Sequence, residues 1–127
     1  MLLENSLRYG ECNDKLSADV RRVLKAIGCD VVEMPRNREN TFCCGAGGGR
    51  IWMDDSTLDE RPSENRIKEA SQLGVDTFVV ACPKDFTMYT DAAKTTVLGA
   101  NLVVVDVIEL VAEALSLELA AAGTGDQ

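Results

Sequence analysis

The chain has 127 residues, of which 46% are hydrophobic and 27% charged, and its net charge is −8. This length fits one domain with a single core. The acidic balance argues against a nucleic-acid-binding surface, which needs clustered Lys and Arg. No apolar run reaches the roughly 18 residues of a bilayer span, and the N-terminus does not read as a signal peptide. We therefore expect a cytoplasmic protein without a membrane span.

The five cysteines and the absence of histidine restrict the chemistry that this chain can perform. In a reducing compartment, clustered cysteines are typical of metal ligands or redox groups rather than of structural disulfides. Without histidine there is no imidazole general base and no Cys-His nucleophile pair. Any site must therefore depend on thiols, carboxylates, Lys, Arg or backbone amides.

Strands and helices alternate along the predicted chain. Near-continuous Val and Ile segments are typical of buried parallel strands, and the intervening segments have apolar residues at helical spacing. Gly28 is a typical helix stop, and Ser63 and Asp106 are typical N-caps. The expected strands are residues 6–10, 29–34, 75–81 and 101–105, and the expected helices are residues 16–27, 63–73, 83–93 and 106–119.

This alternation predicts an α/β fold with three layers. We expect a sheet of about four mostly parallel strands, with helices on both faces. Residues 1–122 are expected to form one domain, and residues 123–127 a disordered tail.

Three thiol positions follow predicted strands. These are Cys12, the Cys43-Cys44 pair and Cys82. Because ligands bind at the carboxyl ends of parallel strands, we expect these thiols to converge on one edge of the sheet. Cys29 precedes its strand and is expected at the opposite edge or in the core.

The segment 41–50 combines two adjacent thiols with four glycines. Soft thiolates select zinc and iron–sulfur clusters. Adjacent cysteines point in different directions, so they fit a larger cluster better than one tetrahedral ion. Glycines would let the backbone pass close to such a cluster and offer N–H groups to its sulfur atoms.

The stretch from Val31 to Val111 resembles the cysteine-rich CCG domain. That domain occurs in one of the subunits of heterodisulfide reductase, in the glycolate oxidase iron–sulfur protein and in related Fe–S oxidoreductases. The family pattern is a Cys, a long spacer, Cys-Cys-Gly, a second long spacer and Cys-x-x-Cys. The matching residues here are Cys12, Cys43-Cys44-Gly45 and Cys82, whereas Asp85 stands at the last Cys position.

The resemblance implies a redox domain, part of an oxidoreductase complex rather than a complete enzyme. It implies an iron–sulfur cluster, cubane 4Fe–4S rather than noncubane, with zinc or no metal as the alternatives. Partners would be Fe–S or flavoprotein subunits, and a homodimer stays open. The implied ligands are Cys12, Cys43, Cys44, Cys82 and Asp85, and the implied supporting loop is Gly45, Gly47, Gly48, Gly49 and Arg50.

Other interpretations remain open at this stage. Cys44 to Arg50 has the C-x5-R spacing of the tyrosine-phosphatase anion loop, in which a thiolate sits among backbone N–H groups. The thiols can also pack as small hydrophobic side chains. Asp85 equally suits the first turn of a helix, where an acid is favourable. A metal-free interaction module is the third alternative.

Overall fold

The computed structural model of the chain describes residues 2–3, 12–54 and 56–123. Strands and helices alternate in it, as the sequence predicts. The elements are β1 (Leu2–Leu3), α1 (Cys12–Ala26), β2 (Val32–Glu33), α2 (Pro62–Ser71), β3 (Thr77–Val80), α3 (Pro83–Thr95), β4 (Val103–Asp106) and α4 (Val107–Gly123). Short 3-10 turns are η1 (Arg38–Asn40), η2 (Gly47–Trp52) and η3 (Val97–Gly99).

All strand pairs in the sheet are parallel, in the order β2-β1-β3-β4. The extended part is the β3–β4 pair, which runs from Thr77↔Val103 to Val80↔Asp106. β1 and β2 contribute only two residues each. The mixed α/β class with a parallel sheet is confirmed. The strand predicted at residues 6–10 lies outside the described residues, and the described strand that opens the chain is Leu2–Leu3.

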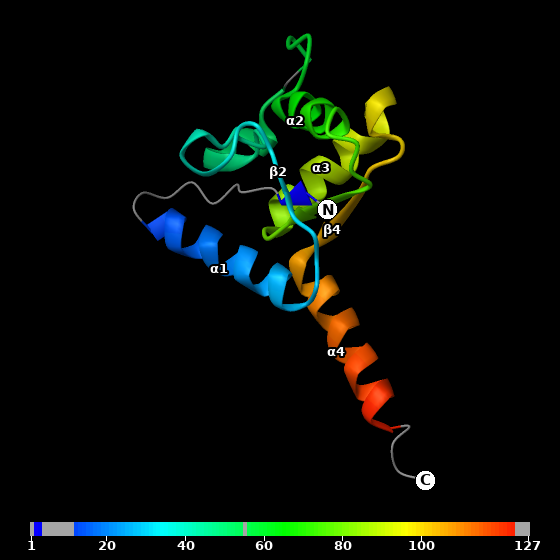
Figure 1. Ribbon diagram of the computed structural model, residues 1–127. Coiled ribbons are helices and arrows are strands. Elements are labelled where there is room, and N and C mark those ends of the chain that lie inside the picture. The colour runs from blue at the N-terminus through cyan, green and yellow to red at the C-terminus, as the bar shows by residue number, and fades with distance from the viewer. Residues whose placement is uncertain (1, 4–11, 55, 124–127) are drawn as a thin grey trace.

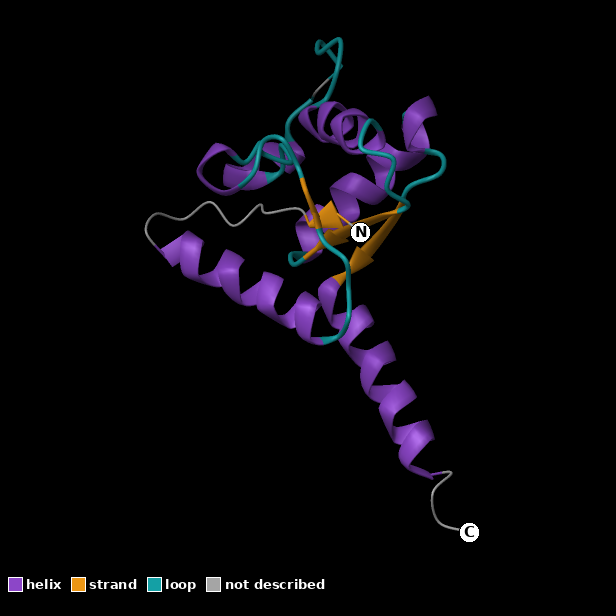
Figure 2. Ribbon diagram, in the orientation of Figure 1, coloured by secondary structure: helices purple, strands orange, loops and turns teal. Residues whose placement is uncertain are grey.

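Side chains of β3 alternate between two apolar clusters. Phe78 and Val80 pack with residues of α2 and α3, whereas Val79 packs with Leu24 of α1 and with the start of α4. Figure 1 shows α2 and α3 on one side of the strands and α1 and α4 on the other, and Figure 2 shows the strands between them. All three β3 side chains are fully buried, and each such burial stabilises the fold by about 1.5–3 kcal/mol.

The helix ends follow local rules, with one correction. Gly28 has φ of +84° after α1, and the N–H of Cys29 reaches back to Leu24 O at 2.9 Å, so the predicted stop is confirmed. The predicted N-cap Ser63 is wrong. α2 begins one residue earlier at Pro62, and Arg61 occupies the N-cap position. Proline suits that first position because its missing N–H would be unpaired there in any case.

α4 begins at Val107, where the Asp106 carboxylate accepts the N–H of Ile108 at 2.9 Å. Its first turns pack on the cluster around Val79, and its later turns extend away from the other elements (Figure 1). Of the described helices, none is both long and apolar enough to cross a membrane. Gly123 ends α4, and the remainder of the tail expected at 123–127 lies outside the described residues.

Candidate metal centre

A tight turn at Arg38–Thr41 precedes the thiol pair and directs the chain toward the core. Arg38 is the only non-glycine residue with positive φ (54°) in the described chain. Its carbonyl accepts the N–H of Thr41 at 3.2 Å and the Thr41 hydroxyl at 2.7 Å. Thr41 is buried, so these bonds fix the direction in which the chain enters Phe42 and Cys43.

The two adjacent thiols lie in different environments. Cys43 is exposed, and its Sγ accepts the N–H of Gly45 at 3.3 Å. Cys44 is 7% exposed and belongs to the core cluster on the α2–α3 side. Gly45 has φ of +87°, a conformation that L side chains rarely adopt, and it lies against Pro62. One thiol therefore faces solvent and the other faces the interior.

α3 brings an acid to the buried thiol. Asp85 lies in the first turn of α3 and is 1% exposed. The Cys44 thiol donates a hydrogen bond to the Asp85 carboxyl. Burial is the main cause that raises the pKa of Cys44 to about 12, opposed by the Ala46 N–H, and burial also raises the pKa of Asp85 to about 6. The pair is thus a thiol and a poorly solvated acid in contact.

The remaining cysteines lie on other elements. Cys82 is the N-cap residue of α3, half-buried, three positions before Asp85. Cys12 is the first residue of α1, and its side chain is outside the described part of the chain. Cys29 packs near Leu24 and Val79 on the other side of β3, so it does not belong to this site.

The donor chemistry of the site suits a soft metal. Cys43 and Cys44 each have a backbone N–H directed at sulfur, from Gly45 and Ala46 respectively. Such bonds stabilise thiolates bound to iron or zinc. The side chains of residues 12–54 and 56–123 that the structure describes do not by themselves place three or more Cys, Asp or Glu close enough to hold a metal ion. The donors match a metal or cluster by their chemistry, and the described side chains alone do not form a complete ligand set.

The glycine run after the thiols forms the η2 turn. Gly48 and Gly49 have φ of +65° and +80°, whereas a Cβ added at Gly47, Gly48 or Gly49 would meet no described atom within 4 Å. Gly48 and Gly49 are therefore needed for their backbone conformation, and the described residues leave space beside all three glycines. Arg50 is partly buried at the end of the run, and its carbonyl accepts the N–H of Met53 at 2.9 Å.

This environment does not suit a phosphatase nucleophile. A thiol nucleophile of the C-x5-R type requires a lowered pKa, whereas burial and the neighbouring Asp85 raise the pKa of Cys44. The surroundings of Cys44 therefore do not favour the C-x5-R interpretation.

A charged network beside the thiol loop escaped the sequence analysis. Glu69 of α2 binds Arg36 and Arg66, and the Arg36 guanidinium lies over the Phe42 ring, with Cζ 4.1 Å from the ring centroid. The available signal was weak. Arg66 and Glu69 are one helical turn apart, but no local pattern connects Glu69 to Arg36, which lies 33 residues before it.

Comparisons with known proteins show the family to which the chain belongs. The family model of the CCG cysteine-rich domain matches residues 8–88, more than half of the chain. "Probable iron-sulfur-binding oxidoreductase FadF" of Bacillus subtilis is 37% identical over 109 residues, covering 85% of this chain and 15% of that protein. "EtfAB:quinone oxidoreductase" of Syntrophomonas wolfei is 33% identical over 101 residues, covering 75% and 14%.

A third relative is one of the subunits of the dihydromethanophenazine:CoB--CoM heterodisulfide reductase of Methanosarcina barkeri. It is 42% identical over 99 residues, covering 76% of this chain and 23% of that protein. This chain thus spans less than a quarter of the length of each of these relatives. No solved structure matches it significantly. On the family match and these identities, the chain belongs to the cysteine-rich CCG domain family.

Proposed function

We propose that this chain is a redox domain that binds an iron–sulfur cluster and passes electrons within a multi-subunit complex. The observation that carries the proposal is the thiol pair itself. Cys43 and Cys44 each accept a backbone N–H at sulfur, and Cys44 lies against Asp85 beside the turn that bears Cys82. The names of the relatives, an iron–sulfur-binding oxidoreductase and two further oxidoreductases, support the same chemistry.

The proposed ligands are Cys12, Cys43, Cys44 and Cys82, with Asp85 as the residue at the fifth position of the family pattern. A bound cluster would supply one-electron transfer. The chain's own contribution is to hold two sulfur atoms in position and to exclude water from Cys44. The N–H groups of Gly45 and Ala46 would withdraw electron density from the ligand sulfur atoms and so favour the reduced state.

We favour a 4Fe–4S cluster of the cubane type over zinc. One thiol of the pair faces solvent and the other the core, which suits two separate metal atoms better than one tetrahedral ion. Asp85 in place of a fifth cysteine argues against the noncubane form. Zinc remains a distinct outcome of the test below.

We further propose that residues 1–122 form one domain of three layers. Its middle layer would be a four-stranded sheet that includes the short strands β1 and β2. Its partners would be Fe–S or flavoprotein subunits, because an isolated cluster needs an electron donor and an acceptor. A cytoplasmic setting suits the four free thiols among the described cysteines, Cys29, Cys43, Cys44 and Cys82.

The test is anaerobic reconstitution of the purified chain with ferrous iron and sulfide. We expect bound iron and sulfide, a broad visible absorption band that is bleached by dithionite, and an EPR signal from the reduced protein. Cys43→Ser, Cys44→Ser and Cys82→Ser should each lower the bound iron, whereas the control Cys29→Ser should not. A chain that takes up zinc alone, or that binds iron equally well after Cys43→Ser and Cys44→Ser, would refute the proposal.

A further inference from the structure

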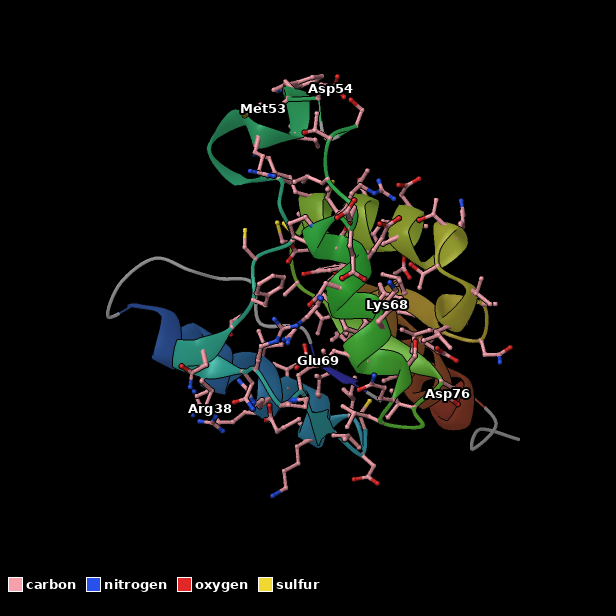
Figure 3. All side chains as sticks on the ribbon, turned by 90° about the horizontal axis from the view of Figure 1, so that it is seen from above. Arg38, Met53, Asp54, Lys68, Glu69 and Asp76 are labelled. Carbon is pink, nitrogen blue, oxygen red and sulfur yellow. The ribbon has the colours of Figure 1, made fainter. Side chains whose placement is uncertain are left out.

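Glu69 is the centre of an ion-pair network on α2. Its Oε2 accepts hydrogen bonds from Arg36 Nε at 3.0 Å, from Arg36 Nη2 at 2.8 Å and from Arg66 Nη1 at 2.9 Å. Its Oε1 accepts the backbone N–H of Arg36 at 3.2 Å. Asn65 contributes a further bond, in which its Oδ1 accepts Arg36 Nη2 at 2.7 Å. Figure 3 shows Glu69 between α2 and the segment that carries Arg38.

The Arg66–Glu69 part of this network is removed from water, whereas the Arg36 end reaches solvent. The Arg66 side chain is fully buried, Glu69 is 13% exposed and Arg36 is 37% exposed. Burial of the Glu69 carboxyl raises its pKa, but the hydrogen bonds from Arg36 and Arg66 outweigh burial, so the pKa lies below its ordinary value. The carboxylate is therefore held in its charged form, and both arginines are fixed by it.

Arg36 connects the network to the thiol loop. Its guanidinium plane lies over the Phe42 ring at 4.1 Å, within the range of a cation–π contact. Phe42 directly precedes Cys43. The turn between Arg38 and Thr41 restrains the backbone that precedes Phe42. The Arg36 guanidinium over the ring restrains the Phe42 side chain.

We infer that Glu69 is a positioning residue for the thiol loop, acting through Arg36 and the Phe42 ring on the placement of Cys43 and Cys44. Only the effect of this positioning on metal binding rests on the proposed function. The positioning itself is a property of the metal-free protein, because the contacts that produce it join described residues of the chain. It predicts that loosening the network opens the loop locally without opening the opposite apolar cluster.

Thiol alkylation by iodoacetamide tests this in the metal-free protein. All variants carry Cys43→Ser, so that an adduct at Cys43 cannot displace Cys44. Mass spectrometry then gives the ratio of labelling rates at buried Cys44 and at Cys29, a half-buried thiol beside the opposite cluster that serves as the internal reference. Urea unfolding of each variant measures any global loss of stability. We expect this ratio to rise about two- to five-fold in Phe42→Leu, and about tenfold in Glu69→Gln.

Two matched controls separate positioning from general destabilisation. Phe42→Tyr keeps the aromatic face and should keep the wild-type ratio. Lys68→Gln removes another ion pair of α2, that of Lys68 with Glu60, on a part of the helix away from the Arg38 segment (Figure 3). It should leave the ratio unchanged. A ratio that stays at the wild-type value in Phe42→Leu overturns the inference, even where Glu69→Gln fails to fold.

A second measurement distinguishes this inference from the proposed function. In the chain with Cys43 restored, iron content and the position of the visible band are measured after reconstitution for Phe42→Leu and Phe42→Tyr. Lowered iron or a shifted band in Phe42→Leu alone supports positioning of the ligands. Bound iron that is lost in Cys43→Ser but unaltered in Phe42→Leu keeps the function and removes the consequence of the positioning for the metal. Absence of iron in the wild type refutes the function, and the labelling ratio still decides the positioning.

Discussion

The Cys44 thiol donates a hydrogen bond to the Asp85 carboxyl. This bond joins the thiol loop to the first turn of α3. Both side chains are nearly inaccessible to solvent. Burial of an acid at this place costs free energy unless a partner forms a hydrogen bond with it. The residue at the position where the family pattern has its last cysteine is therefore buried against Cys44 and is not a solvated helix-capping acid.

Asp85→Cys should increase metal binding. A thiolate is a better ligand than a carboxylate for iron–sulfur clusters and for zinc, and residue 85 already contacts Cys44. We expect a higher iron-to-protein ratio after reconstitution and slower loss of iron to a chelator. Asp91→Cys is the matched control, because it places a thiol on an exposed part of the same helix. Equal gains in both variants would mean that residue 85 does not reach the metal.

Gly45→Ala should destabilise the chain more than Gly48→Ala. Both positions have positive φ, which costs an L residue about 1–2 kcal/mol. Only at Gly45 would the new Cβ also press on Pro62, 3.2 Å from its Cγ, whereas at Gly48 it would meet nothing within 4 Å. Urea unfolding of the metal-free variants measures the difference. Equal losses would mean that Pro62 moves away freely.

The sequence predicted the elements whose signal is local. β3, β4 and the four helices follow from Val-rich runs, helical spacing and residues such as Gly28 and Asp106. β1 was not predicted at Leu2–Leu3, because two residues become a strand only by pairing with β2 and β3. That pairing joins segments that are far apart in the sequence, and two residues are too few to show the alternation of a strand.

The site shows the same division. The convergence of Cys12, Cys43-Cys44 and Cys82 was expected because each follows a predicted strand, and it stays a prediction. Asp85 was named from the family pattern, and its contact with Cys44 is a feature of the fold. The support of the loop by Glu69 was not predictable, because Arg36 reaches it from a polar loop that looked solvated. The sequence does not show whether a charged residue is buried, because the same residue types form both exposed and buried ion pairs.

Trp52 should behave as a fully solvated indole. It is the only tryptophan of the chain and is 89% exposed, next to Met53, which lies near the tip of a projecting segment in Figure 3. We expect its fluorescence maximum and its acrylamide quenching to match those of N-acetyltryptophanamide. Trp52→Ala should change the free energy of unfolding by no more than about 0.5 kcal/mol. A blue-shifted, poorly quenched emission would mean that this side chain is covered in solution.

The ion pair between α1 and β2 should make stability depend on acid. The hydrogen bond from Arg21 is the main cause that holds the pKa of Glu33 below its ordinary value of 4.5, and burial opposes it. A carboxyl with a lowered folded-state pKa contributes stability that is fully present above its unfolded pKa and is lost as the pH falls through the folded value.

Glu33→Gln should therefore lower the free energy of unfolding at neutral pH by about 1 kcal/mol or less, since the Glu33 side chain is 36% exposed and solvent screens the pair. The difference from the wild type should shrink as the pH falls from 4.5 through the lower folded-state pKa, because the wild-type carboxyl becomes protonated over that range and loses the same interaction. Urea unfolding at several pH values measures this. Glu113→Gln, an exposed acid of α4, is the control. A difference that stays constant into acid would mean that the charge of Glu33 contributes nothing and that only its shape matters to the packing of α1.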